Sequence, residues 1–301
     1  MTVAPGPARR LLHICYCCDD ADAVTAQFVD ALGLVGVMST PLEPSDGAVL
    51  GLHGEIVSRA RFVVDHRGPR VSPSIEIQEW VSPTVVGWPS VDPFEVGIKA
   101  AGFAVASVAD AVRRLGRSGC VVGTIDEHGA TMVDRRGVTL ELAHDPSLAD
   151  GRARLHHLRL TVTDLDVSLA LYCRLGFEII DVDAVTSAGA VGGPEAADGR
   201  RARLRLPDEP FEFHLYAWDR PGGFGTHYPV ANHAGIFRLA VAVDDTHAAV
   251  RRLDGSGWRL DRGPMTIALH GTPVDDMWIA FLRDPDGIPV ELVERPRSAF
   301  R

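Results

Sequence analysis

One strand–turn–helix pattern recurs four times along the 301-residue chain, and this repeat limits the folds that the chain can adopt. Two copies are similar: "HICYCCDDADAVTAQFVDALGL" begins at His13, and "HLRLTVTDLDVSLALYCRLGF" begins at His157. The other two have diverged further: "AAGFAVASVADAVRRLGRSG" from Ala100 and "RLAVAVDDTHAAVRRLDGSG" from Arg238, which share "AVRRL". The repeat predicts four copies of one unit that begins with a strand and a helix.

Each copy continues through short β-rich runs to a final strand. These final strands are "SIEIQEW" from Ser74, "GVTLELA" from Gly137, "FEFHLYA" from Phe211 and "GIPVELVE" from Gly287. The sequence therefore predicts an α+β fold, with four β-α-β-β-β modules paired into two cleft-forming domains. The turn-rich link "HDPSLADGRAR" divides the chain into near-equal halves, so we expect one pair of modules in residues 1–146 and another in 153–301.

Alternation of residue types assigns the two faces of the predicted strands. In the third module, Leu158 and Leu160 lie on the face opposite His157 and Arg159. We expect the large apolar face to pack under the helix of its module and the other face to line a cleft. Each module then presents one residue of its first strand and one of its last strand to the cleft: His13 with Glu76, Ala100 with Glu141, His157 with His214, and Arg238 with Glu291.

The cysteines of "HICYCC" are interpreted as part of a first strand rather than as a separate metal or redox motif. Alternation places Cys15 and Cys17 on the cleft side with His13, where they are small groups in the wall. Six of the eight cleft residues are of types that bind metal ions. We therefore treat the histidines and glutamates, and not the thiols, as the candidate ligands.

At these residues the chain resembles the vicinal oxygen chelate superfamily, which includes glyoxalase I, extradiol dioxygenases and bleomycin-resistance proteins. The strongest pieces of the resemblance are "HHLRLTVTDLDVSLALYCRLGF" and "FLRDPDGIPVELVE". The resemblance implies modules that curl in pairs around a cleft, with metal ligands on the first and last strands. It also implies a divalent metal cofactor (Fe2+, Mn2+, Zn2+ or Ni2+) and a small oxygenated substrate.

Carried over by position, the metal ligands expected in the second half are His157, His214 and Glu291. If modules 2 and 3 pair instead, the two histidines meet Glu141 rather than Glu291. Arg238 stands where the family would have a ligand. It is expected to act in catalysis by orienting an anionic part of the substrate, or else to pair with Glu291.

In the first half, the expected metal ligands are His13 and Glu76. Glu141 is expected to be a third ligand or, when free of a metal, a catalytic general base. Each half lacks a ligand on the first strand of its second module, where Ala100 and Arg238 stand. A metal-free cleft that binds its ligand by hydrogen bonds is therefore the alternative to a metal site.

Composition limits the classes of partner. The formal net charge of −10 disfavours a nucleic-acid partner and a polybasic membrane contact. The first residues lack the apolar segment of a signal peptide, and no apolar run reaches membrane-spanning length. We expect a cytoplasmic protein whose partner is a small-molecule substrate, and a homodimer is compatible with the resemblance.

Two functions follow from these features. The first is a divalent-metal-dependent enzyme of the glyoxalase or extradiol dioxygenase type, with dioxygenase, isomerase and lyase chemistry left open. The second is a non-catalytic small-molecule-binding protein of the drug-sequestering, bleomycin-resistance type. The missing fourth ligand of each half motivates the second function.

Overall fold

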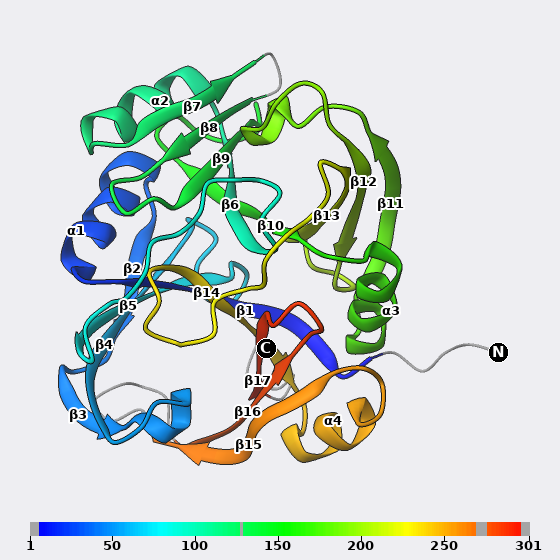
Figure 1. Ribbon diagram of the computed structural model, residues 1–301. Helices are drawn as coiled ribbons and strands as arrows, with labels where there is room; N and C mark the ends of the chain where they lie inside the picture. The colour runs from blue at the N-terminus through cyan, green and yellow to red at the C-terminus, as the bar shows by residue number, and fades with distance from the viewer. Residues whose placement is uncertain (1–5, 127–128, 269–275, 296–301) are drawn as a thin grey trace.

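The chain has the predicted α+β fold, as seen in a computed structural model that describes residues 6–126, 129–268 and 276–295 (Figure 1). Module 1 contains β1 (Ala8–Cys18), α1 (Ala21–Ala26), a π-helical turn (Gln27–Ala31), β2 (Val35–Ser39), β3 (Glu43–Asp46), a 3-10 turn (Gly47–Leu50), β4 (Glu55–Val64) and β5 (Ser74–Ser82). Module 2 contains β6 (Gly97–Val105), α2 (Val108–Arg117), β7 (Val121–Ile125), β8 (Gly129–Val133) and β9 (Thr139–His144).

The second half of the chain repeats this order. Module 3 contains β10 (Ala153–Thr161), α3 (Leu165–Leu175), β11 (Glu178–Val185), a 3-10 turn (Gly189–Val191), β12 (Asp198–Arg205) and β13 (Glu212–Arg220). Module 4 contains β14 (Gly235–Val243), α4 (Thr246–Leu253), β15 (Arg259–Ile267), β16 (Met277–Arg283) and β17 (Pro289–Glu294). Each of the four predicted first strands and helices is therefore present.

Each module's helix begins after a side chain that caps it. Asp20, Ser107, Asp164 and Asp245 each accept a hydrogen bond from a backbone N–H of the first helical turn. Each cap follows the end of the first strand by two or three residues, so the turn from strand to helix is similar in all four modules. Within the described residues, no helix has the length and apolar character needed to cross a membrane.

The modules pair across the halves of the sequence. One sheet has the order β15-β16-β17-β14-β1-β5-β4-β2, with β3 beside β4, and so combines modules 1 and 4. The other has the order β11-β12-β13-β10-β6-β9-β8-β7 and combines modules 2 and 3. The division into residues 1–146 and 153–301 separates modules along the chain, but each sheet takes one module from each half. The reason is that the first strands of modules 1 and 4, and those of modules 2 and 3, pair antiparallel at the sheet centres.

One hydrophobic core joins the two sheets. Its buried side chains come from both sheets and from all four helices, which Figure 1 shows on the two outer sides of the molecule. Phe28 of module 1 contacts Phe103 of module 2 across this core, with ring centroids 5.9 Å apart. The predicted apolar faces of the first strands all belong to it, including Leu158 and Leu239. The opposite faces are therefore left to line the clefts.

Two buried tyrosine–aspartate hydrogen bonds connect modules that are consecutive in sequence. Tyr16 Oη donates to Asp134 Oδ2 at 2.5 Å between modules 1 and 2. Tyr172 Oη donates to Asp284 Oδ2 at 3.3 Å between modules 3 and 4. Each aspartate follows the strand that precedes the last strand of its module. The same turn thus links neighbouring modules in both halves of the chain.

Stability is expected to depend on the ionisation of Asp284. Burial is the main cause that raises its pKa to about 7. Asp284 therefore keeps its proton in the folded protein up to about pH 7, whereas the unfolded chain loses that proton near pH 4. Because of this difference, the ionisation of Asp284 lowers the free energy of unfolding as the pH rises from about 4 to about 7. Relative to wild type, Asp284→Asn should gain about 1–3 kcal/mol in unfolding free energy between pH 4.5 and pH 8. Urea denaturation at both pH values measures this gain.

Wild type and Asp284→Asn are compared at the same pH, so the contributions of all other titrating groups cancel in the difference between their unfolding free energies. The exposed Asp150 gives a matched control, since Asp150→Asn should leave the difference from wild type unchanged between the two pH values. An Asp284→Asn difference that stays constant with pH would show that Asp284 is ionised throughout this range.

Candidate functional site: two polar clusters on the concave faces of the sheets

A cavity of about 840 Å³ lies against the concave face of the sheet formed by modules 1 and 4. His13 on β1, Glu76 on β5, Arg238 on β14 and Glu291 on β17 all line it. The cavity thus unites two predicted site residues from each half of the sequence. Apolar side chains form much of the remaining wall, among them Leu50, Ile56, Phe62, Met277, Ile279, Phe281 and Val293.

A buried guanidinium is the centre of this cluster. Arg238 Nη2 donates to Glu76 Oε2 at 2.7 Å, and Arg238 Nε donates to Glu291 Oε2 at 2.9 Å. His13 Nε2 lies 3.3 Å from the same oxygen of Glu76 and 3.4 Å from that of Glu291. Burial alone would raise the pKa of Glu291, but Arg238 and His13 lower it to about 2. Glu291 is therefore a carboxylate at neutral pH.

The divalent metal implied by the family resemblance does not fit this arrangement. The guanidinium of Arg238 already donates to both glutamates, and an arginine side chain keeps its positive charge in proteins. A divalent ion on the same carboxylates would lie beside that buried charge, where repulsion is only weakly screened. Two glutamates hydrogen-bond to this fixed organic cation, and His13 lies within ion-pair distance of both of them.

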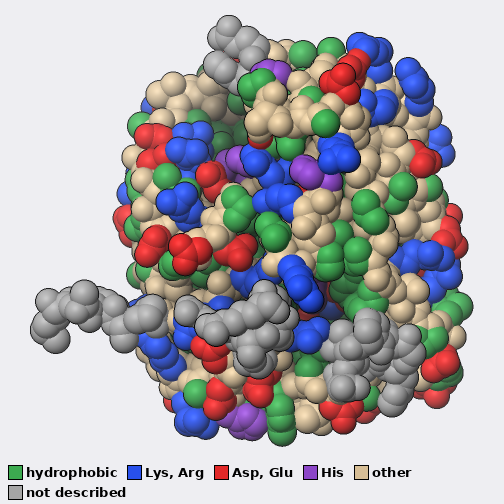
Figure 2. Space-filling view, turned by 180° about the vertical axis from the view of Figure 1, so that it is seen from behind, with side chains coloured by type: hydrophobic (Ala, Val, Ile, Leu, Met, Phe, Trp, Pro, Cys, Tyr) green, Lys and Arg blue, Asp and Glu red, His purple; other side chains and the backbone are tan. Residues whose placement is uncertain are grey.

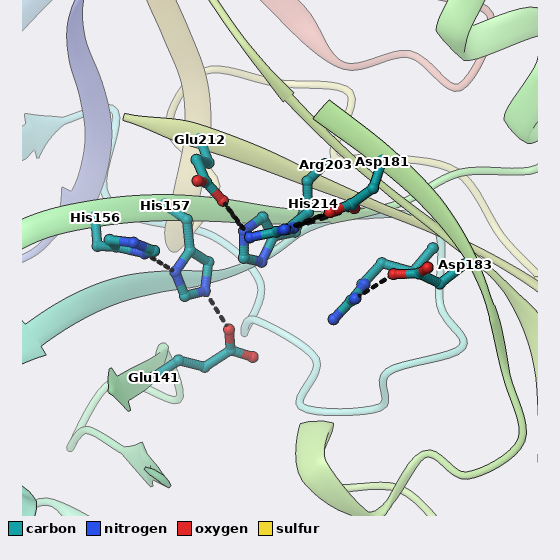
Figure 3. A network of polar contacts seen from close by, with 9 residues as sticks. Glu141, His156, His157, Asp181, Asp183, Arg203, Glu212 and His214 are labelled. Carbon is teal, nitrogen blue, oxygen red and sulfur yellow. Dashed lines mark hydrogen bonds and ion pairs between the residues drawn. The ribbon is translucent and has the colours of Figure 1, made fainter. Parts of the chain in front are cut away.

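The concave face of the other sheet brings Glu141, His157 and His214 together (Figure 3). His157 Nε2 lies 2.6 Å from Glu141 Oε2. The rings of His157 and His214 stack, with centroids 4.1 Å apart and an angle of 9° between their planes. Arg159, the next residue of β10 on the same face, donates from Nε to Glu141 Oε1 at 2.5 Å. This cluster also contains a buried guanidinium against a last-strand glutamate.

Further imidazole and carboxylate groups extend the second cluster. His156 Nδ1 lies 3.0 Å from His157 Nδ1, and His214 Nε2 lies 2.9 Å from Glu212 Oε2. Burial, and next the nearby His157, lower the pKa values of His156 and His214 to about 4. Both rings are therefore neutral near pH 7. Figure 2 shows basic and histidine side chains across the middle of one face of the molecule, with hydrophobic side chains among them.

The second cluster has suitable metal donors, but their geometry does not suit a shared ion. A metal–nitrogen bond lies in the plane of the imidazole ring at about 2.0–2.1 Å. Two parallel rings 4.1 Å apart cannot both direct a lone pair at one ion, and Arg159 already pairs with Glu141. Over the residues that the structure describes, no three His, Cys, Asp or Glu side chains form a group that could hold a metal.

The structure groups the predicted residues by sheet rather than by sequence half. Glu291 lies with His13 and not with His157 and His214, while Glu141 lies with the two histidines of module 3. This is the alternative pairing of modules 2 and 3, and it follows from the antiparallel contacts between the first strands.

Sequence reasoning assigned no role to Arg159. Its position two residues after His157 places it on the cleft face, so alternation alone was a usable signal. Trp80 and Tyr216 share the strand faces of Glu76 and His214 by alternation, and they belong to two small apolar clusters. The cleft faces therefore combine charged centres with apolar walls.

Two concave sheets, each built from two β-α-β-β-β modules with polar clusters on their first and last strands, define the class of glyoxalase-like proteins. A family model described as the Glyoxalase/Bleomycin resistance protein/Dioxygenase superfamily matches residues 154–292. The uncharacterized protein YaeR of Escherichia coli K12 is 30% identical over 146 residues, which are 48% of this chain and 98% of YaeR. A probable lactoylglutathione lyase of Synechocystis is 27% identical over 141 residues, which are 46% of this chain and 94% of that protein.

Solved structures show the same fold over nearly the whole chain. Glyoxalase I from Zea mays has a TM-score of 0.67 at 17% identity, covering 95% of this chain and 92% of that one. A putative dioxygenase from Bacillus subtilis has a TM-score of 0.59 at 14% identity, covering 96% and 86%. The chain belongs to the glyoxalase/bleomycin resistance protein/dioxygenase superfamily.

Proposed function

We propose that this protein binds a small oxygenated organic molecule in the cavity between modules 1 and 4 and removes a proton from a carbon beside its carbonyl group. The observation that carries the proposal is the cluster of His13, Glu76, Arg238 and Glu291 on the wall of a cavity of about 840 Å³. A volume of this size suits a small organic ligand, and apolar walls with a few polar groups are typical of such sites. The likeness to glyoxalase I supports this class of chemistry.

His13 is the proposed general base. Its Nε2 faces two carboxylate oxygens at 3.3 and 3.4 Å, which favours a proton on that nitrogen. Nδ1 then carries the free lone pair and can accept the proton of the substrate carbon. The carbonyl oxygen gains negative charge as the proton leaves, and the guanidinium of Arg238 is a fixed charge that stabilises it. A proton then returns from His13 to the same carbon. This step regenerates the substrate and the free base, so no atom is gained or lost.

No metal takes part in this proposal, because Arg238 pairs with the carboxylates that a metal would need. A second function, binding without catalysis, is supported by the aromatic wall of the same cavity. Phe62 packs edge-on against His13, with ring centroids 5.9 Å apart, and Phe281 lies 6.0 Å from the guanidinium carbon of Arg238. These contacts would hold a planar organic ligand whether or not a reaction follows.

Hydrogen–deuterium exchange of a probe tests the catalytic proposal. 2-Hydroxyacetophenone has a carbonyl, a neighbouring C–H bond and an aromatic ring that suits the wall. In deuterated buffer, the wild-type protein should speed the loss of the CH₂ proton signal measured by NMR. His13→Gln should slow this exchange by about 100-fold or more, because the base is removed. The exposed His66 provides the control, and His66→Gln should exchange the probe at the wild-type rate.

The binding function makes a different prediction for the same probe. Saturable stabilisation of the protein against heating, without exchange above the buffer rate, would support binding alone. If the protein shows no exchange of the probe and no stabilisation by it, that result would contradict both functions for this class of substrate. The cavity variant Ala60→Phe should abolish either response, since Ala60 lines the cavity, whereas Val121→Phe on an exposed strand of the other sheet should not.

A further inference from the structure

The concave faces of the two sheets, each called a cleft below, contain the same three-residue arrangement. In one, Glu291 accepts from Arg238 Nε at 2.9 Å and lies 3.4 Å from His13 Nε2. In the other, Glu141 accepts from Arg159 Nε at 2.5 Å and lies 2.6 Å from His157 Nε2. In both clefts a last-strand glutamate joins the Nε atom of a buried arginine to the Nε2 atom of a first-strand histidine.

The two arginines reach this arrangement from opposite strands. Arg238 stands at the ligand position of module 4 and is the cross-strand partner of Cys15, which lies two residues after His13. Arg159 lies two residues after His157, and its cross-strand partner is Ala100 at the ligand position of module 2. In the pair β1 and β14, the arginine lies on the strand opposite the histidine. In the equivalent pair β10 and β6, the arginine lies on the same strand as the histidine. The position of the cation is shared, although the sequence position is not.

Each guanidinium also has a donor without a protein partner. Arg238 is 4% exposed and Arg159 is 1% exposed, and the Nη1 atom of each has no hydrogen-bond acceptor within the described part of the chain. A buried donor without an acceptor costs about 1–3 kcal/mol, so such donors usually meet a ligand or water oxygen. Both arginines therefore pair with a glutamate through Nε and keep an enclosed Nη1 group that no described acceptor satisfies.

We infer that each cleft uses an arginine guanidinium as the fixed cation that a divalent metal provides in metal-dependent relatives, and that neither cleft takes up a metal ion. In the cavity between modules 1 and 4, the guanidinium of Arg238 supplies the positive charge that a substrate oxygen would otherwise meet on a metal. This deepens the proposed function by naming the group that takes the place of the metal. Its test needs no substrate, so it can fail or succeed separately from the proposed proton transfer.

Metal content tests the inference directly. The 301-residue chain is stripped with EDTA, dialysed against NiCl₂ or ZnCl₂, freed of unbound ions and measured by inductively coupled plasma mass spectrometry. The wild type should retain less than about 0.2 equivalent of metal. Arg238→His should retain about one equivalent, because it replaces the cation by a fourth donor beside His13, Glu76 and Glu291. Arg238→Lys is the matched control: it keeps the positive charge and should bind as little metal as the wild type.

Two results would overturn the inference. One is stoichiometric metal in the wild type that is lost in His13→Ala or in His157→Ala, which would also identify the cleft that holds it. The other is an Arg238→His protein with a wild-type circular dichroism spectrum that gains no metal, since the guanidinium would then not occupy a competent metal position. If Arg238→His does not fold, the wild-type measurement decides alone.

Discussion

Replacing Arg238 by methionine is expected to lower the free energy of unfolding by about 3–5 kcal/mol at pH 7. The guanidinium is 4% exposed and donates to both Glu76 and Glu291. Without it, two buried carboxylates face each other with no permanent cation between them, and removing one partner of a buried ion pair leaves an uncompensated charge. Urea denaturation followed by circular dichroism measures the loss.

Two further variants separate lost charge pairing from lost packing. Adding Glu76→Gln and Glu291→Gln to Arg238→Met should recover most of the stability, since neutral side chains of similar size remove the unpaired charges. Arg9→Met breaks a partly exposed pair with Asp244 and should cost at most about 1 kcal/mol. A loss below about 1 kcal/mol for Arg238→Met would contradict the buried network on which the cleft is built.

Phe103→Ala is expected to lower the free energy of unfolding by about 3–5 kcal/mol and to weaken both sheets together. Phe103 is fully buried in β6 of one sheet, and its ring contacts Phe28 from the module that belongs to the other sheet. The cavity left by the phenyl ring therefore opens in the shared core rather than within one half of the chain. Amide hydrogen exchange should show reduced protection in both β1 and β13.

A different pattern of hydrogen-exchange protection would contradict this prediction. If Phe103→Ala reduces protection only in the sheet that contains β6, the two sheets unfold as separate domains and the core does not couple them. Phe224 is 53% exposed in the link before module 4, so Phe224→Ala controls for the loss of an aromatic ring alone and should change stability little.

The modules and their faces could be predicted from the sequence, because strand alternation is a local signal. Leu158 and Leu160 point to the core and His157 to the cleft simply because side chains alternate along a strand. The same rule explains why Trp80 and Tyr216 share the faces that carry Glu76 and His214. The eight cleft positions were found in this way without knowledge of how the modules pair.

Which modules pair in one sheet depends on contacts between distant parts of the chain, and no local sequence pattern predicts it. Each first strand has a similar apolar face, so the sequence favoured Glu291 as the partner of His157 and His214 and left Glu141 as the alternative. The pairing of Arg238 with Glu291 was one of the two alternatives expected from the sequence, and the structure has it. The contact of Arg238 with Glu76 could not be predicted, since Glu76 lies 162 residues away along the chain. The role of Arg159 follows from the register of β10 against β6, which places it beside Glu141. Charge compensation within the clefts thus depends on the same pairing that the sequence left open.

The pairing of module 1 with module 4, and of module 2 with module 3, has a consequence for the order in which the two sheets can be completed during synthesis. All strands of the sheet that contains β6 and β10 have been made once Arg220 at the end of β13 is added. The β1 edge must wait for β14, the first strand of the last module, before it is covered. We therefore expect that on the ribosome the second and third modules can pair before the first strand gains its β14 neighbour. The cavity cannot be complete before the final module is made, because Arg238 and Glu291 both belong to that module.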